Sequence, residues 1–344
     1  MPHAIRRFQV LFLIVMLISV GRTATGQNSA KSDSETNEKN TLNVLFIGNS
    51  YTARHSLANV IKQMAEAADP NLIFNPTTVI YGGQRLVNHW SFGTQNIVRQ
   101  HSLTREEQLA TIARIRESMG KNPEGKHFRG ALGRQEKLLA ELDAGNMSRT
   151  KWDVIVLQSY RDDIDVAPNA KETLYAQFAP KFAKLAKAQG ARVVLYETTP
   201  TTQNAQPLTT KPDSAPIMDK VKNIARLANS TKSKVASMSL AGLRCQTERP
   251  DLSLRFVNDA HLNQTMAYLT ACSVYAAIFN RSPVGLPVNS VTDIRFLEKD
   301  GQKDKDKDRD GKPITKTFSP KDLADLQRIA WNSYQEFETL RKEQ

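Results

Sequence analysis

The sequence predicts an α/β fold of three layers, in which helices cover both faces of a mostly parallel β-sheet. Two patterns lead to this prediction. Short segments that are apolar at nearly every position alternate along the chain with longer, helix-like segments, and a tight turn follows most of the apolar ones. Strands that are apolar throughout are typical of parallel sheets, because both faces of such a sheet are buried. The run Val154-Ile155-Val156-Leu157, which follows Asp153, is the clearest example.

The expected elements follow one another in regular order. We expect strands at 42–48, 73–81, 152–158, 191–197 and a weaker one at 234–238, and helices at 57–68, 171–189, 216–230, 264–279 and 321–341. Glycines mark the ends of two of them, since Gly82-Gly83 follows the second strand and Gly190 closes the second helix. Strands that alternate with helices of this length indicate βαβ units and hence parallel pairing.

Two segments interrupt this alternation. Residues 93–134 are polar and basic, have no strand pattern and contain helical stretches around 105–119. An insertion of this length is either a lid or binding wall, or a solvated helical excursion without a role. In residues 299–312 lysine and aspartate alternate, and the half calcium loop at 306–311 lacks its closing glutamate because Thr317 stands there. We therefore expect a disordered charged loop in this segment.

The N-terminus has the pattern of a secretory signal peptide. Arg6 and Arg7 precede an apolar stretch at 10–20, and small residues follow at 24–26. The apolar stretch is too short to span a bilayer comfortably. We expect cleavage after Gly26, a flexible leader at 27–41 and a single domain at 42–344. The mature protein would then be secreted or periplasmic, without a stable membrane anchor.

Composition narrows the range of partners. The formal net charge of +12 fits an anionic partner such as an acidic polysaccharide, or simply a basic surface. The chain has no zinc-finger, homeodomain or RNA-binding signature, so we expect no nucleic acid. His55, His101 and His127 lack metal-ligand spacing, so we assign no metal. Cys245 and Cys272 could pair in an oxidising compartment, but the apolar surroundings of Cys272 favour a buried free thiol.

Two segments far apart in the sequence carry the chemistry. Ile47-Gly48-Asn49-Ser50 ends the first strand in a tight turn, so Ser50 should lie at the carboxyl end of that strand, where α/β sheets bind ligands. Asn258-Asp259-Ala260-His261 leads into the helix at 264–279. A serine hydroxyl needs a base to become an effective nucleophile, and His261 can be that base if the fold brings the two together.

With these segments the chain resembles the SGNH (GDSL-like) hydrolases, in particular exported relatives whose first block reads IGNS. Four blocks carry the resemblance: the nucleophile block at 47–50, a glycine block at 81–86, a third block at 152–159 and a histidine block at 258–261. It spans about residues 42–290. The resemblance implies a flavodoxin-like α/β/α sandwich and hydrolysis of an ester without metal or cofactor.

The resemblance also implies a role for individual residues. Ser50 would be the nucleophile and His261 the base that takes its proton. The backbone N–H groups of Ser50 and Gly83 and the side-chain amide of Gln158 would form the oxyanion hole, which stabilises charge that develops in the transition state. Most relatives carry Asn at the place of Gln158.

One position departs from the family pattern. The residue three places before His261, which orients the histidine in this family, is Asn258 instead of Asp. Three interpretations stay open: Asn258 holds the ring without a charge, Asp259 supplies the carboxylate from a shifted loop, or the protein is a hydrolase that has lost activity and only binds. The corresponding Asp-to-Asn change in serine proteases costs about four orders of magnitude in turnover.

Other polar residues near strand ends are weaker candidates. Arg85, His89 and Tyr160 could contact the substrate. Together these observations predict an exported serine esterase that acts on O-acyl esters, O-acetyl esters among them, of a carbohydrate or a small molecule. The alternative is a catalytically silent carbohydrate-binding protein on the same fold.

Overall fold

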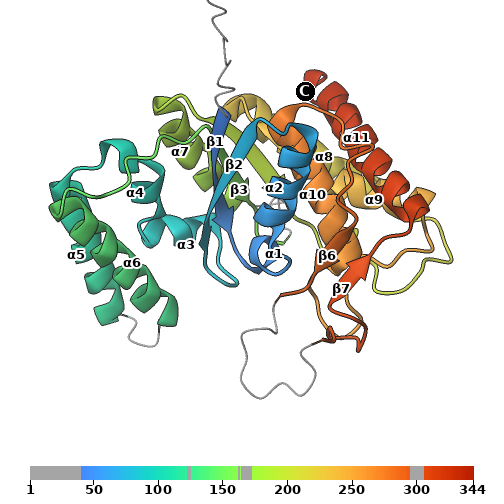
Figure 1. Cartoon of the computed structure of the whole chain (residues 1–344), viewed down its shortest axis with the longest axis horizontal. Coiled ribbons are helices and arrows are strands. Elements are labelled where there is room, and N and C mark those ends of the chain that lie inside the picture. Colours follow the sequence, from blue (N-terminus) through green and yellow to red (C-terminus); the bar gives the residue numbers. More distant parts are fainter. Residues whose placement is uncertain (1–39, 122–124, 162, 164–172, 295–305) are drawn as a thin grey trace, which may run out of the picture. The chain divides into compact units, whose positions relative to one another are not determined.

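The computed structural model describes residues 40–121, 125–161, 163, 173–294 and 306–344 (Figure 1). Five strands form one sheet in the order β2-β1-β3-β4-β5, and each neighbouring pair is parallel. The strands are β1 (Asn40–Gly48), β2 (Leu72–Ile80), β3 (Val154–Gln158), β4 (Arg192–Glu197) and β5 (Lys234–Ser237). This is the flavodoxin-like strand order, so the predicted α/β fold class is confirmed.

The predicted signal peptide lies outside the described residues, as does the leader up to residue 39. Asn40 and Thr41, which we assigned to the leader, instead belong to β1, because they continue its pairing with β2 opposite Leu72 and Ile73. Within the described residues, no helix combines the length and the apolar character needed to cross a bilayer.

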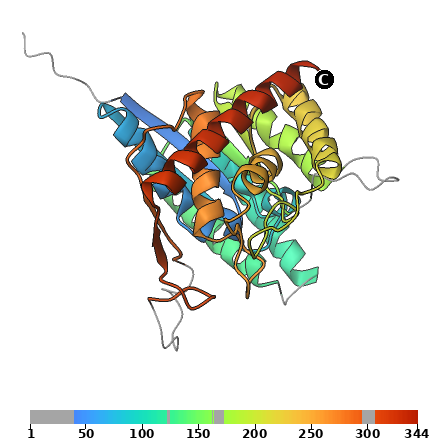
Figure 2. The ribbon, with the colours of Figure 1, turned by 90° about the vertical axis from the view of Figure 1, so that its right-hand side faces the viewer.

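Helices cover both faces of the sheet. One face carries α2 (Leu57–Ala68), α9 (Met238–Glu248), α10 (Gln264–Phe279) and α11 (Pro320–Lys342), and the other carries α3 (Leu86–Ser91), α4 (Thr94–Val98), α7 (Leu174–Ala188) and α8 (Ala215–Thr231). Figure 2 shows α11 lying across α10, with which it is in contact. Along β1, Val44 and Phe46 join one apolar cluster while Leu45 and Ile47 join the other. Two buried faces explain why the strand is apolar at every position.

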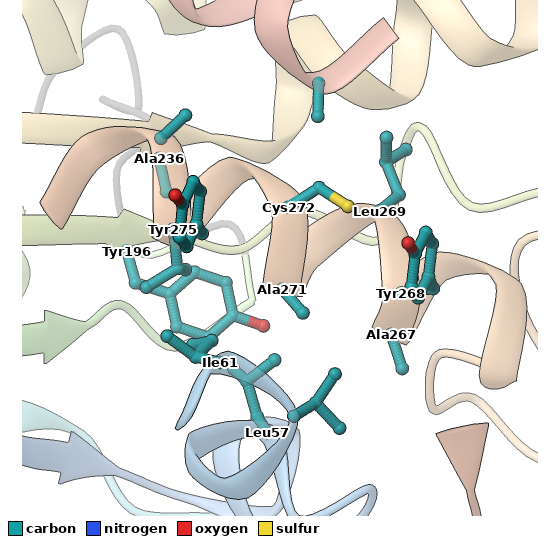
Figure 3. Packing of buried hydrophobic residues seen from close by; sticks show 14 of the residues in the cluster. Leu57, Ile61, Tyr196, Ala236, Ala267, Tyr268, Leu269, Ala271, Cys272 and Tyr275 are labelled. Atoms are coloured by element: carbon teal, nitrogen blue, oxygen red, sulfur yellow. The ribbon is translucent and has the colours of Figure 1, made fainter. Parts of the chain in front are cut away.

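The helix α10 is buried along almost its whole length. Each of its residues except Phe279 is buried, and its apolar side chains form one cluster with Ile61 of α2 and Tyr196 of β4 (Figure 3). A helix that is apolar all round is typical of such a central position. Its hydroxyl groups stay satisfied, since Thr270 and Ser273 bond the backbone carbonyls four residues earlier. Cys245 and Cys272 are both free and buried, as expected for Cys272.

The insertion between β2 and β3 contains a helical hairpin. Its helices are α5 (Arg105–Lys121) and α6 (Lys126–Asp143), so the helical part extends nine residues beyond our predicted end at residue 134. A buried amide network fixes the hairpin to α4: Asn96 donates to Gln108 Oε1 at 2.7 Å, and Gln108 donates to Gln135 Oε1 at 2.9 Å. Gln135 donates in turn to the carbonyl of Gly93 at 3.1 Å.

Three elements of the carboxyl-terminal half were not predicted. These are α9 and the two-stranded antiparallel sheet of β6 (Ser290–Thr292) and β7 (Thr315–Thr317). The prediction of a disordered loop at 299–312 is wrong for 306–312, while 299–305 lie outside the described residues. The carboxylate of Asp308 accepts hydrogen bonds from the N–H groups of Asp310 and Lys312, both at 2.9 Å. These bonds close a tight turn, so the aspartates order the backbone instead of solvating it.

Candidate active site

Ser50 lies at the junction of the first strand and the first helix. β1 ends at Gly48, and Ser50 opens the short helix α1 (Ser50–Ala53). The Asn49 side chain caps this helix by accepting from the Tyr51 N–H at 3.1 Å. Because β1 lies between β2 and β3, its carboxyl end is where the strand order reverses, which is the usual ligand site of this architecture.

Ser50, His261 and Asp259 form a hydrogen-bonded series. Ser50 Oγ lies 2.9 Å from His261 Nε2, inside the range we expected for a nucleophile and its base. His261 Nδ1 lies 2.6 Å from Asp259 Oδ1, and the same oxygen accepts the backbone N–H of His261 at 3.0 Å. The three groups therefore have the geometry of a serine–histidine–carboxylate triad.

The carboxylate two residues before the histidine takes the orienting position, and Asn258 does not. The Asn258 side chain is exposed and points to Asp310, whose Oδ1 also accepts the Asn258 backbone N–H at 3.0 Å. The physical reason is a tight turn at Asp259, where one carboxylate oxygen bonds both the backbone and the ring of His261. Of the two residues that the sequence left open for the orienting role, the structure therefore places Asp259, from the shifted loop, against the ring.

The far side of the Asp259 carboxylate faces two arginines. Arg54 Nη1 lies 3.1 Å and Arg309 Nε 3.6 Å from Oδ2. Burial raises the pKa of Asp259, but the hydrogen bonds from His261 and the charge of Arg54 outweigh it, and the pKa ends well below its ordinary value. Asp259 is therefore ionised whenever the protein is folded near neutral pH.

Gln158 does not occupy the predicted oxyanion site. Its side chain is buried, and its Nε2 donates to Asn49 Oδ1 at 2.7 Å and to the Ser159 carbonyl at 3.0 Å. Its Oε1 accepts from the Asn49 N–H at 3.0 Å and from Thr52 Oγ1 at 2.6 Å. The extra methylene of Gln carries the amide back under the turn, so Gln158 supports Asn49 and leaves no N–H for a substrate.

A glycine makes this support possible. A Cβ atom on Gly48 would lie 2.4 Å from Gln158 Oε1 and 2.6 Å from Thr52 Oγ1, closer than atoms approach in folded proteins. The lack of a side chain at this position therefore lets the amide of Gln158 reach the turn.

The other predicted oxyanion donors do line the site. Ser50 and Gly83 both border the pocket, and Gly83 has a φ of +67°, a conformation that suits glycine. Their N–H groups make no hydrogen bond to another group of the described residues. These two N–H groups can therefore donate to a developing oxyanion, whereas the side-chain amide of Gln158 cannot.

Of the three weaker candidates, only Tyr160 borders the pocket. His89 is buried, bonds the Gly48 carbonyl through Nε2 at 3.0 Å, and has its pKa lowered by burial to about 3. It is a neutral structural histidine, and the prediction that it contacts substrate is wrong. Arg85 is exposed outside the pocket and stacks on Tyr160, with Cζ 5.0 Å from the ring centre.

The pocket has a volume of about 700 Å³ and opens at the edge of the sheet. The insertion at 93–134 contributes Lys126 and His127, at the start of α6, to its lining, so part of this segment lies beside Ser50. The lining residues come from the start of α1, the glycine turn, the insertion, the turn after β3, the histidine loop and the segment after β6: Asn49, Ser50, Tyr51, Ala53, Arg54, Gly82, Gly83, Lys126, His127, Tyr160, Arg161, Ala260, His261 and Ile294.

Sequence reasoning missed the residues that hold Asp259. Arg54 follows the nucleophile by four residues, but its partners Asp259 and Asp293 are more than two hundred residues away. Arg309 and Asp310 lie in the charge run that we interpreted as disordered. A turn-forming Asp-Gly pair at 310–311 was the one signal of order there.

No protein-family model matches this chain, and no curated protein matches its sequence. Some solved structures resemble it. A DUF4886 family protein from Bacteroides uniformis matches with a TM-score of 0.45 and 15% identity, over 86% of this chain and 95% of that one. A variant of Axe2, an acetyl-xylooligosaccharide esterase from Geobacillus stearothermophilus, matches with a TM-score of 0.41 and 11% identity, over 71% and 95%. Because these scores are below 0.5, the fold class rests on the sheet topology, and the candidate site rests on its own contacts.

Proposed function

We propose that this chain is a serine ester hydrolase of the SGNH type. One observation carries the proposal: Ser50 Oγ is 2.9 Å from His261 Nε2, and His261 Nδ1 is 2.6 Å from Asp259, beside a pocket at the reversal point of the sheet. A histidine bonded on one side to serine and on the other to a carboxylate is the arrangement that makes a serine hydroxyl nucleophilic.

In the first half of the proposed reaction, Ser50 Oγ attacks the carbonyl carbon of the ester and His261 Nε2 takes the hydroxyl proton. Asp259 accepts a hydrogen bond from the Nδ1–H group of His261 and stabilises the positive charge that forms on the ring. The N–H groups of Ser50 and Gly83 would bind the oxyanion. The C–O bond to the alcohol then breaks, the alcohol leaves with the proton from His261, and the acyl group stays on Ser50.

The second half repeats this chemistry with water. His261 takes a proton from a water molecule, the resulting nucleophile attacks the acyl carbon, and the bond to Ser50 breaks. Ser50 recovers its proton from His261, and the carboxylic acid leaves. Each proton passes through His261, so no cofactor is required.

As substrate we propose an O-acyl ester of a carbohydrate, encountered outside the cytoplasm. Support comes from the signal-like N-terminal sequence and from the pocket, whose rim includes the aromatic ring of Tyr160 and the polar side chains of Lys126 and Arg161. A sugar ring can stack on the tyrosine while its hydroxyl groups bond polar side chains.

The proposal is tested by turnover and by covalent labelling. We expect the wild-type chain to hydrolyse 4-nitrophenyl acetate, to release acetate from acetylated oligosaccharides and to gain one phosphonyl group from a fluorophosphonate, located at Ser50 by peptide mass spectrometry. Ser50→Ala should lose all three, whereas Ser118→Ala, which alters a half-buried serine of α5 outside the pocket, should lose none. A folded wild type without turnover or label would support the silent carbohydrate-binding protein instead.

A further inference from the structure

Behind the proposed triad lies a buried pair of opposite charges. Arg54 Nη1 contacts Asp259 Oδ2 at 3.1 Å, on the side of the carboxylate that faces away from His261. The remaining nitrogens of Arg54 hold Asp293: Nη2 lies 2.7 Å from Oδ2 and Nε 3.1 Å from Oδ1. The side chains of Arg54 and Asp293 are 1% and 0% exposed, so water screens this pair very little.

Three separate segments converge on this pair. Arg54 ends α1, and Asp293 follows β6, where its backbone N–H bonds the carbonyl of Ile314 at 2.8 Å. The ring of Phe256, from the loop that carries His261, lies 4.2 Å from the guanidinium carbon of Arg54. The pair therefore joins the nucleophile helix to the histidine loop and to the carboxyl-terminal segment.

The charges along this series decide what Asp259 can do. Arg54 alone would cancel the negative charge of Asp259 and remove the electrostatic reason for His261 to take a proton. With Asp293 included, two carboxylates and one guanidinium leave one net negative charge. That charge is available to the imidazolium, which forms when Ser50 gives up its proton.

We infer that Arg54 and Asp293 are positioning residues of the site: Arg54 fixes the orientation of Asp259, and Asp293 offsets the charge of Arg54 so that Asp259 still stabilises the imidazolium. This inference rests on the proposed function. Neither residue touches the reacting atoms, so both act through Asp259.

Other charged and titratable groups face the histidine and Asp259 from the surrounding elements. Arg309 is 44% exposed, so solvent weakens its effect at 3.6 Å, and His55, beside Asp293, is neutral because burial lowers its pKa to about 4. Among the described residues, the charged and titratable groups that line the pocket or contact this series are Tyr51, Arg54, His55, Lys126, His127, Tyr160, Arg161, Asp259, Asp293, Arg309 and Asp310. Of these, Asp293 is the group besides Asp259 itself whose charge directly opposes that of Arg54.

The test compares the pH dependence of kcat/KM for Asp293→Asn and for the double variant Arg54→Met/Asp293→Asn. In Asp293→Asn, the charge of Arg54 cancels the charge of Asp259. The acid limb of the kcat/KM profile should therefore move to lower pH by at least about half a unit, and the plateau value of kcat/KM should fall about tenfold. The double variant keeps one net negative charge on Asp259. Its acid limb should stay at or above the wild-type position, while kcat falls about tenfold with KM little changed.

Asp219→Asn is the matched control, because it removes the same charge from an exposed position on α8. It should leave both the limb and the plateau unchanged. Acid limbs that are identical in wild type, Asp293→Asn and the double variant would overturn the inference and leave the pair a purely structural one.

Two further measurements keep the inference testable. If Asp293→Asn does not fold, Arg54→Lys is the variant to measure, because it keeps the positive charge but loses the planar guanidinium that bonds two carboxylates at once. Its kcat should fall about tenfold, while the acid limb of its pH profile stays at the wild-type position. A moved limb or an unchanged kcat would contradict the inference. If the wild type has no turnover, the proposed function fails on its own. The titration midpoint of His261, followed by NMR in wild type and Asp293→Asn, then decides: a lower midpoint in the variant supports the inference and an equal midpoint overturns it.

Discussion

The two halves of the proposed triad are held in different ways. Ser50 stands between a strand and a helix, and the groups around it are fixed by the sheet and by Asn49 and Gln158 beneath the turn. Asp259 and His261 lie in a loop without regular secondary structure, fixed by side chains from distant segments, among them Arg54 and Asp310. The nucleophile half therefore depends on backbone geometry, and the base half on long-range polar contacts. Substitutions should affect the two halves differently.

The largest effect should come from the base half, at Asp259. Asp259→Asn keeps the shape but removes the charge and disturbs the tautomer of His261, so kcat should fall by about three to four orders of magnitude. Asn258→Ala should stay within about threefold of wild type, because its exposed side chain does not touch the ring. Steady-state kinetics with 4-nitrophenyl acetate checks both variants. A large loss at Asn258 with none at Asp259 would show that the orienting residue is misassigned.

The next largest effect should be the pH dependence of folding stability, to which both halves contribute because each contains a buried neutral histidine. His89 bonds Gly48 in the nucleophile half, and His55 bonds the Leu262 carbonyl in the base half. Burial lowers their pKa values to about 3 and about 4, below the ordinary 6.5 that applies when the chain is unfolded.

Below pH 6.5 the unfolded chain therefore binds protons that the folded chain does not, so stability should decrease as pH falls. The loss should be about 1.4 kcal/mol per pH unit for each histidine down to its folded pKa. Urea unfolding at pH 7 and pH 5 measures this loss. His89→Gln should remove about half of the dependence; an unchanged slope in that variant would rule out the assignment.

A smaller effect should come from the nucleophile half at Gly48. Gly48→Ala places a Cβ 2.4 Å from Gln158 Oε1, so the amide beneath the turn must move, and the free energy of unfolding should fall by about 1–3 kcal/mol. Gly133→Ala in α6 is the control: apart from its chain neighbours and the backbone of its own helix, no atom lies within 4 Å of the added Cβ, so the change should be neutral or slightly stabilising. Equal stability of the two variants in urea would show that the turn tolerates a side chain.

The base half should also respond to Asp310, which lies about fifty residues along the chain. Asp310→Ala removes the acceptor for the N–H groups of Val257 and Asn258, at 2.9 and 3.0 Å, so the loop loosens and kcat should fall about tenfold. Asp306→Ala changes an exposed aspartate of the same segment and should leave kcat unaltered. Similar rates for both variants would mean that the loop keeps its shape without this contact.

The smallest effect should come from the insertion, which lines the pocket without touching the triad. His127→Ala should change kcat/KM for an acetylated oligosaccharide by about threefold while the rate with 4-nitrophenyl acetate stays the same, because only the larger substrate reaches the wall. Deleting the hairpin should shift the preference between small and polymeric esters in the same direction. Proportional changes for both substrates would show that the insertion does not select between them.

The same contrast explains how much the sequence could predict. The bounds of α2 and α10 agree with prediction because their apolar patterns are local, and α10 starts after a capping Asn263. The choice between Asn258 and Asp259 depends on a turn and on Asp310, and no local pattern contains that contact. Gln158 was misassigned for a related reason: an amide can donate or accept, and its partner Asn49 lies 109 residues away.

The amide network of the insertion has a practical consequence for protein engineering. Asn96, Gln108 and Gln135 lock the hairpin to its root by directional bonds, and Gly93 leaves no space there, since an added Cβ would lie 2.7 Å from Thr111. Directional bonds fix orientation more strictly than apolar packing does. A hairpin of different sequence that keeps Gln108 and Gln135 should therefore dock in the same pose on a root that keeps Gly93 and Asn96, so the pocket wall can be exchanged while the sheet and the proposed triad stay untouched.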